Sequence, residues 1–574
     1  MVRLLFVPAM LAAAAAPSKP NIVFFLTDDQ DQMLGGSFPN IGGVTPMPQT
    51  KVQMEAKGAM ATNFFIHTPI CCPSRAETLS GRYFHNIKMA PTTPPLPTYK
   101  YPNCMHINET KVNNATFAKY LKEDGGYTVG CFGKYLNTVP KYVAEGFDAW
   151  MVNGGGDYIA PKFSTHGMGW HGMADGNWQG SVDNYTTAVV GNASVAWIRK
   201  VVAEEPTRPF FAYVAPKAAH EPFQPAPWYE EHWDAAWPAT EPRDAPAWNC
   251  SAASRADKHG NIATQPMLSD EAAVVIAGVF KNRWRTLMSV DDVIGAVIDE
   301  VEALGLTDNT YFFYTSDHGF QLGQFNIIMD KRNVYDWDTR IHLLARGPGI
   351  AAGSTWSQPA TQVDLAPTFL GIAGLAKPAQ MDGKSLLPLL TAAAPSAGAA
   401  AAAAAAAPLH PATARHLAAL GPADKYAAGW RDAAFIEYYF VDPNVKCVAN
   451  CTIPSTAKFH THDRDCTDLV NDKACWGGNI CNQDCYATEG VENNFIALRT
   501  GTGAGTGVLY AEFQTGDAAS VELPFTSPDF VEMYDTANDE WEMKNVAKTA
   551  PADQVADLHA RVQQFYHCAG DSCL

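Results

Sequence analysis

The stretch NIVFFLTDDQ, residues 21–30, decides the fold class of this 574-residue chain. Its apolar run, Ile22 to Leu26, is followed by a pair of acids, Asp28 and Asp29. Three other runs have the same form: residues 129–132 lead to Lys134, residues 210–214 lead to Lys217 and His220, and residues 311–314 lead to Asp317 and His318. Short apolar runs that stop at polar residues predict strands that are buried on both faces.

Helical patterns and glycine-rich turns separate these runs, and the longest pattern spans Glu271 to Leu304. Strand and helix therefore alternate, which predicts an α/β fold with a large, mostly parallel sheet flanked by helices. In such sheets, functional sites form beyond the carboxyl ends of the strands. Four strands would bring acids, lysines and histidines to one edge, so we expect an active site there.

The composition changes after MDGKSLLPLL, which ends at residue 390. Residues 391–428 are alanine-rich and of low complexity, typical of a flexible insertion or a surface helix. In residues 429–574, the stretches DAAFIEYYF, NNFIALRTG and GVLYAEFQTG alternate as antiparallel strands do, and residues 550–568 have the pattern of an amphipathic helix. We therefore expect a catalytic domain over residues 18–390 and a smaller C-terminal α+β subdomain with an antiparallel sheet.

The first 17 residues have the pattern of a secretory signal peptide: Arg3, then a short apolar run from Leu4 to Ala16 that ends in small residues. The alternative is a buried N-terminal helix. The run is too short to cross a bilayer comfortably, and no later stretch predicts a transmembrane segment. Six N-x-Ser/Thr sequons, at Asn108, Asn114, Asn184, Asn192, Asn249 and Asn450, also fit the secretory pathway. A lysosomal and an extracellular destination both remain open.

The chain carries 41 basic and 59 acidic residues, a net charge of −18. That balance argues against a nucleic-acid-binding protein, which needs a basic face. It does not exclude an anionic substrate, because a local cluster of lysine and arginine can override the overall sign.

The chain has 13 cysteines, most of which should pair in an oxidising compartment. Two end the chain, Cys568 and Cys573. Because the number is odd, one cysteine could be unpaired and take part in catalysis, or it could simply be a buried free thiol. Six crowd into one segment with spacings that favour disulfides over a zinc module: Cys447, Cys451, Cys466, Cys475, Cys481 and Cys485.

The stretch ICCPSRAETLSGRY, residues 70–83, has helix signals at both ends. Pro73 suits a first helical turn and Gly81 a helix C-terminus, which would put Cys71 just ahead of the helix. The N–H groups and dipole there favour negative charge, and Arg75 adds a fixed positive fork for anionic oxygens. The pattern suits a nucleophile, although Cys71 and Cys72 could also be structural.

Cys71-Cys72-Pro73-Ser74-Arg75, followed by Leu79, Gly81 and Arg82, resembles the signature of the type I sulfatases. The resemblance extends over about residues 20–390, through KPNIVFFLTDDQ and TSDHGFQLGQFNIIMDKRNVYDWD, and PDFVEMYDTANDEWEMKNVA carries it into the C-terminal part. The stretches CCPSRAETLSGRYFHN, GKYLN and DKRNVYDWD are most similar to the N-acetylglucosamine-6-sulfatase branch. The fold that this resemblance implies is alkaline-phosphatase-like.

The resemblance implies that Cys71 is oxidised to formylglycine by a formylglycine-generating enzyme, with Cys72 as a bystander. It also implies a divalent-metal site in which the modified Cys71 joins Asp28, Asp29, Asp317 and His318. Without the family, each acid pair would more often be a cap or a turn. Oxygen ligands favour Ca²⁺, but the branch usually has asparagine where this chain has His318, which leaves Mn²⁺ or Mg²⁺ open.

Four further positions match the family's sulfate-binding residues: Arg75, Lys134, His220 and Lys331. A lone lysine is more often a solvated surface charge, so Lys134 and Lys331 depend on their family-like neighbours. Many sulfatases have a histidine two positions after this first lysine, where this chain has Leu136. That role is vacant, or it passes to Asn137 or His85 as substrate-pocket residues.

The implied reaction begins with hydration of the formylglycine aldehyde to a geminal diol. One hydroxyl, ionised with help from the metal and Arg75, attacks sulfur in line, and His220 protonates the leaving alcohol. The second hydroxyl then loses its proton, which expels sulfate and restores the aldehyde. The expected substrate is a sulfated saccharide, N-acetylglucosamine 6-sulfate in a glycosaminoglycan-like polysaccharide.

Three other hypotheses about the function remain. One is an arylsulfatase acting on small aryl esters, and a second is a phosphoester or phosphonate hydrolase of the same superfamily. The third is a secreted glycan-binding protein without activity, although every catalytic position that maps is occupied.

Overall fold

The computed structural model describes residues 19–31, 45–91, 106–140, 142–233, 241–268, 270–395, 406–439, 491–501, 507–518 and 521–573. The expected signal peptide and the cysteine-rich segment at 447–485 lie outside the described residues, as does Asn450. The predictions made for them therefore stay predictions.

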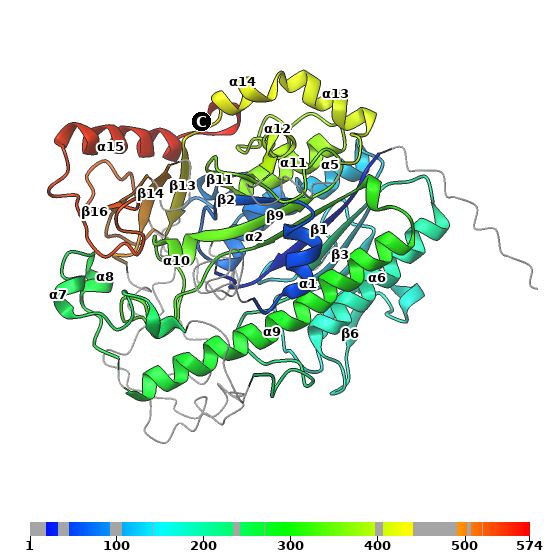
Figure 1. Ribbon diagram of the computed structural model, residues 1–574, viewed down its shortest axis with the longest axis horizontal. Helices are drawn as coiled ribbons and strands as arrows, with labels where there is room; N and C mark the ends of the chain where they lie inside the picture. Colours follow the sequence, from blue (N-terminus) through cyan, green and yellow to red (C-terminus); the bar gives the residue numbers. More distant parts are fainter. Residues whose placement is uncertain are drawn as a thin grey trace, which may run out of the picture.

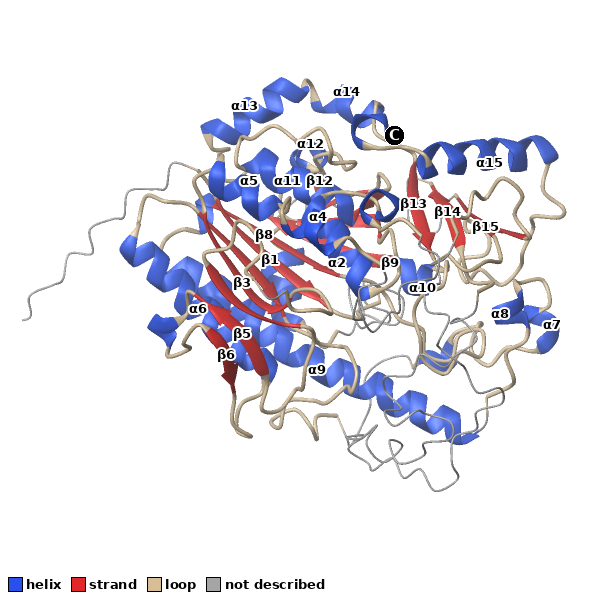
Figure 2. Cartoon of the chain, turned by 180° about the vertical axis from the view of Figure 1, so that it is seen from behind, coloured by secondary structure: helices blue, strands red, loops and turns tan. Residues whose placement is uncertain are grey.

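Five parallel strands form the centre of the large sheet, in the spatial order β8-β1-β7-β3-β4. All four predicted strands are among them, and each is buried almost along its whole length because helices cover both faces (Figures 1 and 2). Their bounds are β1 Asn21–Thr27, β3 Thr128–Lys134, β4 Ala149–Asn153, β7 Phe210–Ala215 and β8 Thr310–Ser316.

Antiparallel neighbours extend this centre on both sides. Among the described residues the sheet has 12 strands, with β5 and β6 beyond β4 and with β9, β2, β10 and β12 beyond β8. The prediction of a mostly parallel sheet therefore holds for the centre, whereas the whole sheet is mixed. The strands next to the centre, β9 and β5, run antiparallel to β8 and β4, whereas β10 and β11 pair with β2 in parallel. The outer strands are β2 Ala59–Phe65, β5 Lys162–His166, β6 Gly176–Gln179, β9 Arg340–Arg346, β10 Ser354–Trp356, β11 Ala360–Thr361 and β12 Ala394–Pro395.

Two helical layers cover the sheet. One face carries α6 and the long α9, Asp270–Ala303, which differs by one residue at each end from the predicted pattern. The other face carries α2, α5 and α11 (Figure 1). Alternate residues of β1 divide between the two cores: Phe24 packs on the α11 side and Phe25 on the α6 and α9 side. Helix bounds on and around the sheet are α1 Pro48–Thr50, α2 Cys71–Ser80, α3 Phe84–Ile87, α4 Glu109–Asn113, α5 Phe117–Glu123, α6 Thr186–Glu204, α7 Ala252–Arg255, α8 Gly260–Ala263, α10 Asp336–Thr339, α11 Leu365–Ile372 and α12 Leu387–Ala392.

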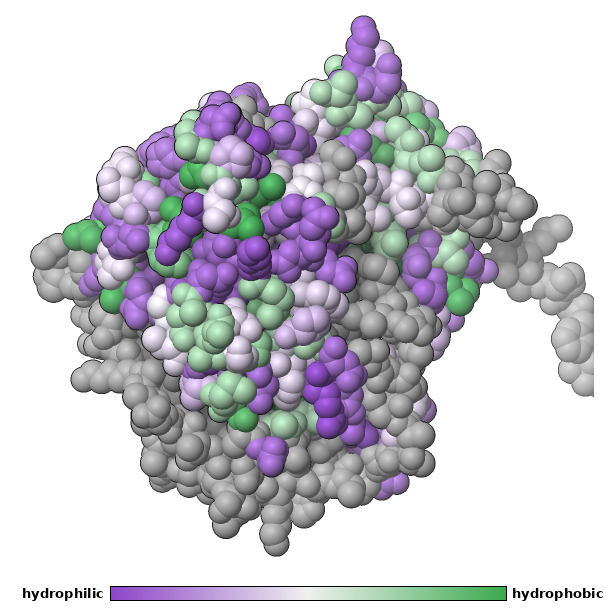
Figure 3. Space-filling model, turned by 60° about the vertical axis from the view of Figure 1, so that its left-hand side comes forward, coloured by the Kyte–Doolittle hydropathy of each residue, from purple (hydrophilic) through white to green (hydrophobic). Residues whose placement is uncertain are grey.

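The C-terminal part has its own antiparallel sheet, as predicted, with the order β13-β14-β15-β16. The helix α15, Ala552–Tyr566, packs on it through stacked rings of Phe435 and Phe565, 5.6 Å apart. The strands are β13 Ala433–Tyr438, β14 Phe495–Thr500, β15 Val508–Phe513 and β16 Phe530–Asp535. Where this part and α7 and α8 come forward, the surface is mostly hydrophilic with scattered apolar side chains (Figure 3).

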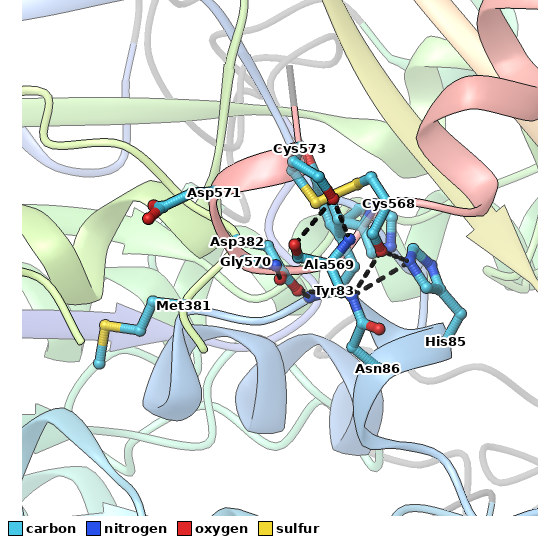
Figure 4. Close-up of a disulfide and its surroundings, with 12 residues drawn as sticks. Tyr83, His85, Asn86, Met381, Asp382, Cys568, Ala569, Gly570, Asp571 and Cys573 are labelled. Carbon is cyan, nitrogen blue, oxygen red and sulfur yellow. Dashed lines mark hydrogen bonds between the residues drawn. A yellow bond between two sulfur atoms is a disulfide. The ribbon is translucent and has the colours of Figure 1, made fainter. Parts of the chain in front are cut away.

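In the alanine-rich region, the described residues form α13, Pro411–Leu420, and α14, Ala423–Ala428. Both lie at the surface over α11 and α12 (Figure 1), which favours the surface-helix interpretation for that part. A disulfide joins Cys568 to Cys573 at the end of the chain (Figure 4). None of the helices described is long and apolar enough to cross a membrane.

Candidate active site

Cys71 is the first residue of α2. The prediction placed it just ahead of the helix, but the extended residue Ile70 takes the N-cap position instead. Gly81 ends the helix in the left-handed conformation, φ 66°, as its C-cap. Cys71 is buried and has a free thiol, whereas Cys72 is disulfide-bonded. The helix thus presents Cys71 at its positive end, where an anion is favoured.

The strand-end acids meet because β1 and β8 are adjacent, parallel and in register, with Thr27 opposite Ser316. Asp28 and Asp29 leave β1 at the edge where Asp317 and His318 leave β8. Ligand atoms of Asp28, Asp29, Cys71 and His318 all lie within 4.8 Å of one another. Within this group, His318 Nε2 is 3.2 Å from Cys71 Sγ, and His318 Nδ1 is 3.4 Å from Asp29 Oδ1.

Asp317 lies beside this group of four, but its carboxylate faces a cation. Its Oδ2 accepts a hydrogen bond from Arg75 Nε at 2.7 Å, while its Oδ1 lies 3.4 Å from His318 Nε2. Its backbone carbonyl accepts a hydrogen bond from Ser74 Oγ on α2. Asp317 therefore fixes the start of α2 against β8 in addition to facing the other acids.

Three of the predicted cations lie directly against these acids, and all three are buried. Lys331 Nζ is 2.7 Å from Asp29 Oδ1 and 3.2 Å from Cys71 Sγ. Lys134, at the end of β3, forms an ion pair with Asp28. Arg75 Nη2 is 3.2 Å from Asp28 Oδ2, and Arg75 Nη1 donates to the carbonyl of Lys134 at 2.9 Å. The contacts join strand ends β1, β3 and β8 to α2 around Cys71.

Neighbouring cations outweigh the effect of burial on the pKa values of the two acids that follow β1, Asp28 and Asp29. Burial alone would raise the pKa of Asp29, but Lys331 and His220 hold that pKa at about 2. Lys134 and His220 likewise keep the pKa of Asp28 well below its ordinary value despite burial. Burial and Asp28 raise the pKa of the Cys71 thiol to about 12, so these neighbours do not activate the thiol itself.

His220 follows β7 at the same edge, as predicted, and shares a cluster with Asp29 and Glu221 in which ligand atoms lie within 4.8 Å. Its Nδ1 is 3.0 Å from the carbonyl oxygen of Glu221 and 3.3 Å from the Glu221 carboxylate. Two acceptors therefore face Nδ1, which makes Nδ1 the protonated nitrogen and leaves Nε2 for a substrate. Burial and Lys134 lower the pKa of His220 well below its ordinary value, and a bound anion would oppose that shift.

Lys217 is a site residue to which the family resemblance gave no role. Its Nζ donates to the carbonyl of Gly156 and lies 4.7 Å from the ring centroid of Tyr158. Burial lowers its pKa to about 8, although Glu221 opposes the shift. The sequence did carry a signal for it, because Lys217 stands at the end of a buried strand in the same way as Lys134.

A family model described as Sulfatase matches residues 20–375, which include the whole of this site. The chain belongs to the sulfatase family. The predicted family and enzyme class, sulfuric ester hydrolase, are thereby confirmed.

Known proteins agree with this membership. The sulfatase is 28% identical to the human N-acetylglucosamine-6-sulfatase over 571 residues, which cover 98% of this chain and 87% of the human one. A structure solved in complex with its substrate D-glucosamine-2-N,6-O-disulfate aligns with a TM-score of 0.61 and 21% identity over 95% of this chain and 97% of that one. A phosphonate monoester hydrolase of Agrobacterium radiobacter aligns with a TM-score of 0.57 and 18% identity over 95% and 96%. The two structural matches confirm the fold.

His85, one of two candidates for the missing histidine, lies beyond the opposite end of α2 from Cys71. A ten-residue helix separates them, roughly 15 Å of axial rise. His85 binds Glu437 and the carbonyl oxygen of Cys568 beside the disulfide (Figure 4). His85 therefore lies where the catalytic part of the chain contacts the C-terminal part, and not at the Cys71 site.

Leu136 and Asn137, the other two positions considered for the missing histidine's role, have different surroundings. Leu136 is fully buried in the core on the α2 side of the sheet, so it cannot take a polar role in this sulfatase. Asn137 follows it, and its Oδ1 is buried without a hydrogen-bond partner among the described residues. An unsatisfied carbonyl oxygen fits a ligand-facing position, and a pocket role for Asn137 stays a prediction.

Proposed function

We propose that this sulfatase removes sulfate from 6-O-sulfated N-acetylglucosamine residues of a glycosaminoglycan-like polysaccharide. The single observation that carries the reaction is the position of Cys71, at the positive end of α2 with Lys331 Nζ 3.2 Å away and Arg75 behind it. The choice of sugar is supported by the similarity to N-acetylglucosamine-6-sulfatases, which spans almost the whole chain.

The residues present fit a hard divalent cation. Asp28, Asp29 and His318 supply two carboxylates and an imidazole next to position 71, and Asp29 Oδ2 is buried without a hydrogen-bond partner among the described residues. An orphaned carboxylate oxygen in a cluster of acids is what a cation ligand looks like when no ion is present. Asp28, Asp29, Asp317, His318 and residue 71 would hold the ion, for which we propose Ca²⁺, with Mn²⁺ or Mg²⁺ as alternatives. Bound there, it would supply Lewis-acid stabilisation of a sulfuryl oxygen.

Formylglycine at position 71 would supply a hydrated aldehyde as the nucleophile, made by a formylglycine-generating enzyme. Two features of the chain support Cys71 over Cys72 as the modified residue. Cys71 keeps a free thiol and faces the acids and Lys331, whereas Cys72 is disulfide-bonded and packs into the hydrophobic core.

The cationic side chains would bind the sulfate group. Arg75, Lys134 and Lys331 are buried around Cys71, where a fixed positive charge stabilises charge on sulfuryl oxygens more strongly than in water. In its doubly protonated form, His220 would give the Nε2 proton to the leaving sugar oxygen, while Glu221 holds the proton on Nδ1.

The secretory pathway, with a lysosomal or extracellular destination, is part of this proposal. Asn114 and Asn192, two of the sequon asparagines, are exposed and could carry glycans without repacking the core. No nucleic-acid partner is proposed, given the net charge of −18.

A desulfation screen tests the proposal. The formylglycine-bearing enzyme is incubated with N-acetylglucosamine 6-sulfate, isomers sulfated at other positions, 4-nitrophenyl sulfate, and a phosphonate and a phosphate ester of nitrophenol. The 6-sulfate should be hydrolysed with the highest kcat/KM. Greater activity on the phosphonate would identify a phosphonate hydrolase, and inactivity on every ester would identify a glycan-binding protein.

A further inference from the structure

The loop that carries His220 also carries a large exposed indole, that of Trp228. The loop follows β7 and reads HEPFQPAPW from His220 to Trp228. Trp228 has 54% of its surface exposed, more than Trp170, which is 37% exposed. Single exposed apolar side chains are common, so exposure alone says little. Trp228 differs from other exposed apolar side chains in two ways: its ring is held by specific contacts, and a series of residues connects it to the site.

Trp228 is anchored at its edges. The ring of Tyr185 meets it edge-on, with centroids 5.7 Å apart and planes at 73°, and the Tyr229 ring lies 6.2 Å away. The next residue, Tyr229, is itself fixed, because its hydroxyl donates to both carboxylate oxygens of Asp292 at 3.0 Å. An indole held in this way loses little conformational freedom when a ligand binds to it.

A row of aromatic rings connects Trp228 to the site. Its inner end is Tyr158, whose ring lies under Lys217 Nζ and whose hydroxyl donates to the carbonyl of His220 at 2.8 Å. Tyr158 stacks on Tyr185, with centroids 5.7 Å apart and planes at 19°. Tyr185 in turn contacts Trp228, and its hydroxyl donates to Gln224 in the same loop. The row contacts the loop at both of its ends, so it fixes the position of the exposed Trp228 indole relative to His220.

We propose that Trp228 is a sugar-binding platform that holds a saccharide unit next to the sulfated residue. The substrate class is then a sulfated oligosaccharide or polysaccharide, and not a small aryl sulfate. The inference rests on the proposed function for the identity of the sulfated sugar.

The chemistry of the row favours a sugar over another occupant. A pyranose has an apolar C–H face that lies flat on an indole, and polar edges that stay in water, which matches an indole exposed on one side. The inner end of the row is cationic through Lys217, which suits the anionic end of the same ligand. Binding energy from a remote unit of the substrate is also a general way to improve turnover at the reacting group.

The test compares a short and a long substrate with the same sulfated residue. Kinetic constants are measured for N-acetylglucosamine 6-sulfate and for a tetrasaccharide with that residue at its non-reducing end. For Trp228→Ala we expect KM for the tetrasaccharide to rise about tenfold, the effect of roughly 1.4 kcal/mol. KM for the monosaccharide and kcat for both should stay within about twofold, because the platform touches only the second unit. Trp228→Phe should recover most of the loss.

Trp170→Ala is the matched control. Trp170 lies near Lys200, which is fourteen residues along α6 from the first residue of that helix, Thr186. Because Tyr185 precedes Thr186, roughly 21 Å of helix separates the two ends. The control variant should leave both substrates unchanged. Equal changes in KM on the two substrates for Trp228→Ala, or an equal effect of Trp170→Ala, would overturn the platform.

A binding measurement separates this inference from the proposed function. Isothermal titration of the desulfated tetrasaccharide does not depend on turnover. We expect the wild type to bind it and Trp228→Ala to bind about tenfold more weakly. If the wild type binds the glycan with this difference but desulfates neither sugar, the proposed function fails and the platform stands. If the wild type does not bind it, or if Trp228 mediates self-association in size-exclusion chromatography instead, the platform is wrong.

Discussion

His67 Nε2 lies 2.6 Å from Oε1 of Glu437, and both side chains are fully buried. The contact joins the segment before α2 to β13 of the C-terminal sheet. Glu437 also accepts hydrogen bonds from His85 Nδ1 at 2.9 Å and from the Tyr439 hydroxyl. Each imidazole has a backbone carbonyl at its other nitrogen, that of Phe435 for His67 and that of Cys568 for His85. One buried carboxylate thus connects the catalytic domain, the C-terminal sheet and the disulfide loop of Figure 4.

Replacing this carboxylate should weaken the whole fold. We expect Glu437→Gln to lower the free energy of unfolding by about 3–5 kcal/mol, because buried histidines lose a charged partner. Denaturant unfolding measures it. Glu204→Gln is the control, since Glu204 forms an exposed pair with Lys200 that is worth less than about 1 kcal/mol. A loss no larger than that of the control would show that the cluster contributes little.

The same cluster should make stability depend on pH. Despite burial, Glu437 raises the pKa of His85, and the two histidines hold the pKa of Glu437 well below its ordinary value. The His85 contribution is complete below its ordinary pKa and is lost as the pH rises through its higher folded value. The Glu437 contribution is complete above its ordinary pKa and is lost as the pH falls through its lower folded value. Other ionisable groups face the cluster: Glu77, Tyr83, Asp382, Tyr439 and Tyr566.

Stability should therefore be greatest in mildly acidic solution and should fall as the pH rises. Melting temperatures of the wild type and of His85→Asn, recorded from pH 4 to pH 8, check this. The variant should have a flatter profile on the alkaline side. A wild-type melting temperature that rises steadily toward pH 8 would contradict the role of His85.

Cys71 should be found as formylglycine when the protein is made together with its maturation enzyme. Mass spectrometry of the peptide around residues 70–75 detects the change, because oxidation of the thiol to an aldehyde alters its mass. Cys72→Ala should still be modified, and Cys71→Ala should be inactive. An enzyme that is fully active with an unmodified Cys71, or modified at Cys72, would refute the assignment.

Asp317→Ala should abolish turnover and reduce metal content while the fold survives, because Asp317 faces both Arg75 and His318. Metal analysis and activity of the purified variant are the measurements. Asp529→Ala, at an exposed position, should keep both. Full sulfatase activity after removal of the metal from the wild type would show that the acids serve another purpose.

His220→Ala should slow a sulfated sugar far more than nitrophenyl sulfate. A general acid matters most for a poor leaving group, so we expect a loss on the order of 10²- to 10⁴-fold on the sugar and a much smaller loss on the phenol. Both substrates are assayed with the same preparation. Equal losses would mean that His220 binds sulfate or supports the loop, and does not supply the proton.

The sequence by itself determined the class of the fold and the centre of the site. Buried strands end in Asp28, Lys134 and Asp317, and parallel strands must bring such ends to one edge. The bounds of α9 were predicted to within one residue because its helical pattern is long and strongly periodic. Cys71 was identified by a local signature, and a helix start is itself a local property.

Only the tertiary structure decided which residues meet from distant parts of the chain. The contact between His67 and Glu437 spans 370 positions, so no local pattern could place His85 away from the site and beside the C-terminal sheet. The row from Lys217 through Tyr158 and Tyr185 to Trp228 likewise depends on how loops fold over the sheet edge. The antiparallel margins of the sheet also required the structure. Local sequence fixes strands, helices and their caps, whereas contacts between loops depend on the packing of the whole chain.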